Sequence, residues 1–134
     1  MIARYDLAPL EGITKQVYRR VWARRFGGAD RCFIPFISPT PHHILTPREQ
    51  RELENPENLP LVPQVMTRRG EDFVWAAEQL AQMGYREVNL NLGCPSGTVT
   101  AKGKGYHEIC PLLHSGSGYC RIGVSFCAAV NFRL

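Results

Sequence analysis

The chain has 134 residues with a formal net charge of +4, and 44% of its residues are apolar. This length suits one small domain, the composition is that of an ordinary globular protein, and the mild charge permits an RNA partner without arguing for one. No apolar run is long enough to span a membrane, and residues 1–10 lack the apolar core of a secretory leader. We therefore expect a soluble, cytoplasmic protein with no membrane partner.

The first predicted strand and helix occupy the start of the chain. Residues 2–8 form a short, mostly apolar run that predicts a strand, and Pro9 ends it. Thr14 is a good N-cap for a helix over residues 15–26, which a Gly-Gly pair stops. Apolar residues dominate one face of that helix, and its arginines are expected to form a solvated outer face, with a phosphate-contacting patch as the alternative. The apolar face is Val17, Tyr18, Val21, Trp22 and Phe26; the arginines are Arg19, Arg20, Arg24 and Arg25.

The following segments continue the alternation of strands and helices. The sequence TPRE at residues 46–49 is a capping box with proline at the first helical position, and it opens a short helix. The cleanest helix covers residues 71–83, where apolar residues recur at helical spacing. Further strands are expected over residues 31–37, 59–66 and 87–92. This order predicts parallel strands with helices outside them.

The last predicted strand ends at a cysteine. Val88 and Leu90 alternate with Asn89 and Asn91, so the apolar period is two, and both asparagines share one face. Asparagine is a poor strand residue, which suggests that these side chains point toward a ligand. The Gly-Cys-Pro turn that follows places the thiol of Cys94 at the carboxyl end of a strand, where α/β folds keep their ligand sites.

The cysteines as a set favour neither a metal site nor a disulfide framework. No two of them form a Cys-x-x-Cys pair, so we expect no zinc. Their odd number and the absence of a secretory leader argue against disulfides. The five are Cys32, Cys94, Cys110, Cys120 and Cys127.

Three motifs in the right order resemble the tRNA-dihydrouridine synthases. They are NLNLGCPSGTVTAKGKG at residues 89–105, LVPQVM at residues 61–66 and LAPLEG at residues 7–12. The resemblance covers roughly the first three quarters of the chain and stops near Gly105. It implies a TIM (β/α)8 barrel, which needs about 250 residues. We therefore expect an α/β chain that forms the N-terminal half of such a barrel, incomplete, with two exposed sheet edges.

The resemblance also implies a reaction. Members of this family use FMN to reduce uridine to 5,6-dihydrouridine in tRNA, with NADPH as the external reductant. Cys94 falls on the position of their general acid, which protonates C5 of the uracil after hydride reaches C6. Asn91 resembles the asparagine that hydrogen-bonds the target base, and Lys102 lies in a basic loop near the RNA or the base. Alternative roles are a structural thiol for Cys94, a turn cap for Asn91 and a solvated loop residue for Lys102.

Two further segments are implied to contact the flavin. Pro9, Leu10 and Glu11 follow the first strand and match a loop that lies against the cofactor. Gln64 matches a glutamine that contacts the isoalloxazine ring, and its amide can both donate and accept, as a flavin edge requires. Taken alone, the first segment would be only a loop, and Gln64 a polar residue at a strand edge.

The chain changes character after Gly105. Residues 106–134 hold three of the five cysteines and one acidic residue, and no helical face can be traced in them. We therefore divide the chain into a partial FMN-binding barrel over residues 1–105 and a divergent tail over residues 106–134, which we interpret as out of frame or otherwise unrelated to the family. Other interpretations are a non-catalytic fragment, or another FMN barrel of the dihydroorotate dehydrogenase type.

Overall fold

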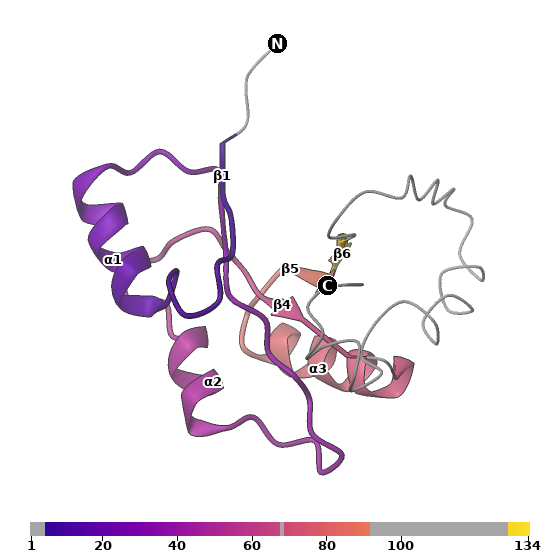
Figure 1. The fold of residues 1–134 in the computed structure, drawn as a ribbon. Helices are drawn as coiled ribbons and strands as arrows, with labels where there is room; N and C mark the ends of the chain where they lie inside the picture. The colour runs from indigo at the N-terminus through magenta and orange to yellow at the C-terminus, as the bar shows by residue number, and fades with distance from the viewer. Residues whose placement is uncertain (1–4, 68, 92–128) are drawn as a thin grey trace.

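In the computed structural model, the described residues are 5–67, 69–91 and 129–134 (Figure 1). They form a mixed α/β architecture in which strands and helices alternate, as the sequence predicts. The elements are β1 (Asp6–Leu7), α1 (Gln16–Arg25), β2 (Arg31–Phe33), α2 (Pro47–Leu53), β3 (Leu61–Val62), β4 (Gln64–Val65), α3 (Gly70–Gln82), β5 (Glu87–Asn91) and β6 (Ala129–Arg133).

The strands form two three-stranded sheets in the orders β1-β2-β3 and β4-β5-β6, and the strands before β6 are parallel and follow chain order. β1 pairs with β2, β2 pairs with β3, and β4 pairs with β5, all parallel. β3 and β4 are two parts of one extended segment on either side of Pro63, whose carbonyl accepts a hydrogen bond from the Asn89 N–H at 2.8 Å. The predicted parallel order is confirmed. That these strands form the first half of a barrel stays a prediction.

The strands are shorter than the sequence pattern predicts, and prolines give the reason. The pattern predicts strands over residues 31–37 and 59–66, which contain Pro35 and Pro63. A proline has no N–H to donate to a ladder, so regular pairing stops beside it. Beyond Pro35, Ile37 pairs with Val65 as an isolated parallel bridge.

The last strand, β6, was not predicted, and it runs antiparallel to its neighbour. It pairs with β5 over five residue pairs, from Glu87 with Arg133 to Asn91 with Ala129. The two faces of β6 are matched to different neighbours. The Phe132 ring packs against Phe73 of α3 at 5.1 Å between centroids, and the Asn131 side chain bonds to Asn89. β6, and not β5, is therefore the terminal strand on this side. That the chain leaves two exposed sheet edges stays a prediction.

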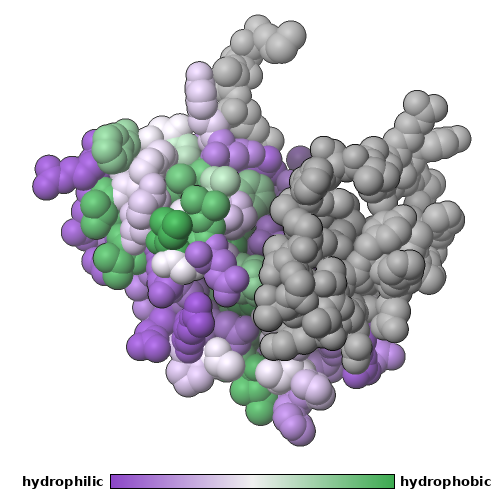
Figure 2. Space-filling model, in the orientation of Figure 1, coloured by the Kyte–Doolittle hydropathy of each residue, from purple (hydrophilic) through white to green (hydrophobic). Residues whose placement is uncertain are grey.

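Helix α1 differs from its prediction in both its cap and its buried face. Its N-cap is Lys15, which makes no side-chain capping bond, and Thr14 instead bonds the loop before it. Arg19 is the buried residue of the helix, at 1% exposure, so the expected solvated position is wrong for this arginine. Val17, Tyr18 and Val21 of α1 are exposed. Hydrophobic residues gather on the molecular surface on the side where α1 lies (Figure 2).

Arg19 is buried because α1 packs against α2 through an ion pair. One guanidinium nitrogen, Nη1, donates to Glu52 Oε2 at 3.1 Å and to the Thr14 carbonyl at 2.7 Å, and Nη2 donates to the Glu52 carbonyl at 2.7 Å. Burial lowers the pKa of Arg19, and the carboxylate of Glu52 opposes that shift. A helical-spacing pattern in the sequence cannot reveal such a partner, since the partner lies 33 residues away.

The other two helices agree with their patterns. The capping box of α2 is present: Thr46 Oγ1 accepts from the Glu49 N–H, and Glu49 accepts from the Thr46 N–H. In α3, Ala76 and Leu80 are buried, and Gly84 follows the helix at φ 89°, a backbone angle that favours glycine. The core joins these helices to the strands through Ile34, Ile37, Leu53, Val65, Ala76, Leu80 and Val88. Within the described residues, no helix is long and apolar enough to cross a membrane.

Tyr85 links the end of α3 to α2 and gives the fold a predictable response to high pH. Its hydroxyl donates to the Leu53 carbonyl at 2.5 Å, and burial raises the pKa of Tyr85 to about 12. An unfolded tyrosine titrates near 10. Between these two pH values the folded state binds more protons than the unfolded state, so the free energy of unfolding falls as the pH rises.

We therefore expect Tyr85→Phe to flatten the loss of stability between about pH 10 and pH 12. The variant should also be less stable at neutral pH by about 1 kcal/mol, because the Leu53 carbonyl loses its donor. Urea unfolding of both proteins at several pH values checks this, with Tyr18→Phe, a change at a more exposed tyrosine, as the matched control. An equal pH slope in wild type and Tyr85→Phe would contradict the assignment.

Candidate functional site

Four carboxamide side chains from three strands meet on one face of the sheet, and we call them the amide cluster: Gln64 of β4, Asn89 and Asn91 of β5, and Asn131 of β6. Pairing register explains the meeting, because Gln64 lies opposite Asn89 and Asn89 lies opposite Asn131. Asn89 and Asn91 share a face since side chains alternate along a strand. Val88 and Leu90 are buried, Val88 in the core against the helices.

The amide cluster is closely hydrogen-bonded. Gln64 Nε2 donates to Asn89 Oδ1 at 2.7 Å, Asn91 Nδ2 donates to Gln64 Oε1 at 3.2 Å, and Asn89 Nδ2 donates to Asn131 Oδ1 at 2.7 Å. Gln64 is 7% exposed and Asn89 is 4% exposed. Among the residues that the structure describes, no buried side-chain nitrogen or oxygen lacks a partner. Gln64 and Asn89 form the buried part of the cluster, whereas Asn91 is half-buried and Asn131 is exposed. The hydrogen bonds of the buried pair fix its geometry, which suits a surface that orients a ligand.

The structure therefore brings together two residues that the resemblance assigned to different ligands. Gln64 was expected at the flavin and Asn91 at the target base. Asn91 is the last residue of β5, and Gln64 follows β3 and begins β4 on the adjacent parallel strand. Asn91 thus stands at the carboxyl end of its strand, the edge of the sheet where ligand sites of α/β folds lie.

The loop that was expected at the flavin also follows the carboxyl end of a strand. Pro9, Leu10 and Glu11 connect β1 to α1, and Leu10 is 53% exposed. Thr14 fixes this loop, because the Leu10 N–H donates to Thr14 Oγ1 at 2.8 Å and the Leu10 carbonyl accepts from the Ile13 N–H at 3.0 Å. Glu11 lines a cavity of about 200 Å³ together with residues that follow β2 and residues of α2.

Two predicted site residues, Cys94 and Lys102, lie outside the described residues. Their roles rest on the sequence. Asn91 stands three positions before Cys94 and is the described residue nearest to it in the chain.

A second polar group on the same face was missed by the sequence interpretation. Arg31, the first residue of β2, donates through Nη2 to Asp6 at 2.5 Å and through Nη1 to Glu87, the first residue of β5, at 2.7 Å. The hydrogen bond to Asp6 is the main cause that raises the pKa of Arg31. Glu87 shares its face of β5 with Asn89, so this face is polar along its length.

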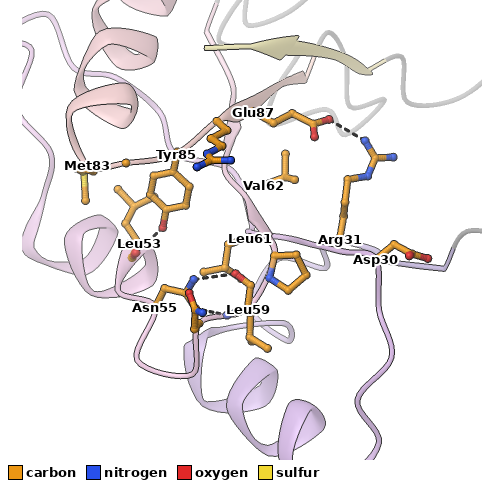
Figure 3. Close-up of a pocket in the computed structure, with 14 residues that line it drawn as sticks. Asp30, Arg31, Leu53, Asn55, Leu59, Leu61, Val62, Met83, Tyr85 and Glu87 are labelled. Atoms are coloured by element: carbon orange, nitrogen blue, oxygen red, sulfur yellow. Dashed lines mark hydrogen bonds and ion pairs between the residues drawn. The ribbon is translucent and has the colours of Figure 1, made fainter.

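A cavity larger than the one beside Glu11 lies by that ion-pair group (Figure 3). It has a volume of about 790 Å³, and Arg31 and Glu87 line it beside Tyr85 and Leu53. Arg31 and Glu87 begin their strands, so the cavity opens at the amino ends of the parallel strands. Catalytic residues of such folds gather at the opposite ends, so we do not take this cavity as the candidate site.

The described residues show no metal centre. In residues 5–67, 69–91 and 129–134 no group of three or more His, Cys, Asp or Glu is arranged to hold an ion. Cys32 is buried in β2, and burial raises the pKa of its thiol.

Comparison with known proteins gives a consistent result. The family model described as dihydrouridine synthase (Dus) matches residues 6–113, which extends past Gly105. "Probable tRNA-dihydrouridine synthase 1" of Synechocystis sp. is 32% identical over 99 residues, 73% of this chain and 27% of that protein. "Probable tRNA-dihydrouridine synthase" of Staphylococcus aureus strain Mu50 is 33% identical over 105 residues, 75% of this chain and 31% of that protein. The chain spans about a third of the length of these curated relatives.

Proposed function

The chain belongs to the dihydrouridine synthase family. We propose that it carries flavin-contacting residues and the proton donor of an FMN-dependent enzyme that reduces uridine to 5,6-dihydrouridine in tRNA. The observation that supports this most directly is the contact between Gln64 and Asn91. A residue proposed for the cofactor and a residue proposed for the base are thereby neighbours on adjacent strands, as a hydride transfer between cofactor and base requires.

The residues of the amide cluster fit a flavin. Gln64 offers a buried carboxamide that can donate and accept at the edge of the isoalloxazine ring. Pro9, Leu10 and Glu11 form a loop that Thr14 holds in place, and this loop is the proposed second contact. When bound, reduced FMN supplies the hydride that adds to C6 of the uracil, and NADPH is the proposed reductant that restores it.

The chain's own residues complete the reduction. Asn91 hydrogen-bonds the uracil and holds its ring beside the flavin. Cys94 keeps a protonated thiol and donates that proton to C5, so that hydride and proton together saturate the C5–C6 bond. Lys102 is proposed to contact the RNA backbone beside the base, where a positive charge is favoured by the phosphates.

A chimera tests this proposal. Residues 6–113 would replace the matched segment of the Staphylococcus aureus relative, which supplies the remaining two thirds of the protein. We expect the chimera to bind FMN and to form dihydrouridine in unmodified tRNA with NADPH, with the intact relative as the positive control. A chimera that is folded and loaded with FMN but forms no dihydrouridine would contradict the proposal.

We expect the 134-residue chain by itself to bind FMN weakly or not at all. The proposed contacts come from one loop and one strand residue, whereas flavin-binding barrels also hold the phosphate with loops of their last strands. Fluorescence titration of FMN with the purified chain checks this, with the chimera as the matched comparison. A yellow protein that is purified with one FMN per chain would contradict this expectation.

A further inference from the structure

The hydrogen bonds of the amide cluster all run in one direction. Asn91 donates to Gln64, Gln64 donates to Asn89, and Asn89 donates to Asn131. If the carboxamide of Gln64 turned by half a rotation, its nitrogen would face the donor of Asn91 and its oxygen would face the acceptor of Asn89. Both bonds would be lost at once unless the other carboxamides of the cluster turned with it, so the orientation of Gln64 is coupled to the orientations of Asn89 and Asn91.

We propose that Asn89 is a positioning residue of the flavin site, holding the carboxamide of Gln64 in that orientation, and that Asn131 of β6 holds Asn89 in turn. The inference rests on the proposed function, because it takes Gln64 as the flavin contact. Asn89 is 4% exposed and its amide is engaged on both sides, so it acts through Gln64 rather than by touching a ligand.

The locked orientation has a chemical consequence for the ligand. One N–H of Gln64 is committed to Asn89, and the second N–H of the same amide has a fixed direction. A fixed donor matches a carbonyl oxygen of the flavin's pyrimidine ring without the cost of ordering the side chain on binding.

Asn131 is the member of the amide cluster that lies outside the segment shared with the family. It lies beyond the segment 6–113 that the family model matches, and it reaches the cluster because β6 pairs with β5 in the register that sets Asn131 opposite Asn89. Strand β6 thus contributes a side chain to the amide cluster, which forms part of the proposed site.

The test measures side-chain amide exchange by NMR in the isotope-labelled full chain. In Asn89→Leu, which removes the acceptor, we expect the Gln64 amide protons to exchange about tenfold faster, the loss of one buried hydrogen bond. In Asn89→Asp the carboxylate still accepts from Gln64, so its exchange should stay near the wild-type rate. The Asn55 amide, which bonds the Leu59 carbonyl at 2.8 Å, is an internal reference that should not change.

The result that would overturn the inference is a folded Asn89→Leu protein with unchanged exchange at Gln64. Circular dichroism establishes that each variant is folded. If Asn89→Leu does not fold, Asn131→Leu decides: the Asn89 amide should exchange faster there, and an unchanged rate overturns the proposed order.

An FMN titration of the chimera, the protein that is expected to bind FMN, separates this inference from the proposed function. In the chimera and in its Asn89→Asp variant we expect FMN to shift the Gln64 amide signal, and in Asn89→Leu we expect the shift to shrink. Faster Gln64 exchange in the Asn89→Leu full chain, with no response of the Gln64 signal to FMN in any chimera variant, would leave the order of the amides standing and overturn their assignment to a flavin.

Discussion

Replacing Cys94 with alanine in the chimera is expected to lower the rate of dihydrouridine formation by about 10² to 10⁴-fold, the usual contribution of a positioned general acid. FMN loading should be unchanged, because the thiol is proposed to serve the base and not the cofactor. The measurement is the amount of dihydrouridine formed per enzyme under single-turnover conditions, starting from reduced flavin.

Two further variants sharpen that prediction. Cys94→Ser keeps a hydroxyl of similar size, but a hydroxyl is a far weaker acid than a thiol, so its rate should stay close to that of Cys94→Ala. Cys110→Ala removes a cysteine outside the Gly-Cys-Pro turn and should react like the unsubstituted chimera. A Cys94→Ala protein with the unsubstituted rate would show that the thiol is structural.

The second large effect is expected at the ion pair between α1 and α2. Changing Glu52 to glutamine keeps its size but leaves the buried guanidinium of Arg19 without a countercharge. Breaking a buried pair in this way costs about 3 kcal/mol of unfolding free energy, toward the lower end of the usual range since Glu52 is 18% exposed. Urea unfolding of the full chain at neutral pH measures the change.

Glu57 provides the matched control for that experiment. It accepts from Arg24 at 2.6 Å and from Arg20 at 3.2 Å, but these arginines are 61% and 40% exposed. Solvent screens such pairs, so Glu57→Gln should leave stability nearly unchanged. Equal losses for the two variants would mean that the burial of Arg19 does not set the cost.

Sequence reasoning succeeded where the signal is local. The capping box from Thr46 to Glu49 is decided by residues three positions apart, and helix α3 by an apolar stripe within a few turns. It was wrong for Thr14, whose hydroxyl bonds Leu10 instead of capping α1, and for Arg19, whose partner comes from another helix. Helical spacing shows that a helix has faces, but the tertiary partners decide which face is buried.

The same distinction holds for the candidate site, of which one part is predictable from the sequence and another is not. That Gln64 and Asn91 lie close together follows from strand order, which the alternation of elements predicts. The part played by Asn131 depends on pairing between segments about forty residues apart in the chain, and the five-residue pattern of β6 is too short to reveal it. The roles of Cys94 and Lys102, and the division of the chain at residue 105, stay predictions.

The antiparallel strand β6 also bears on how the protein behaves at high concentration. The free N–H and C=O groups of a border strand can recruit a strand from another molecule, and this is how sheets extend into aggregates. β6 pairs along all five residues of β5 and becomes the terminal strand of the β4-β5-β6 sheet, so an incoming strand would add to β6 rather than to β5. At the terminus of the β1-β2-β3 sheet, β1 is two residues long. Because a longer strand offers more pairing groups, intermolecular pairing at high concentration is expected to begin at β6 rather than at β1.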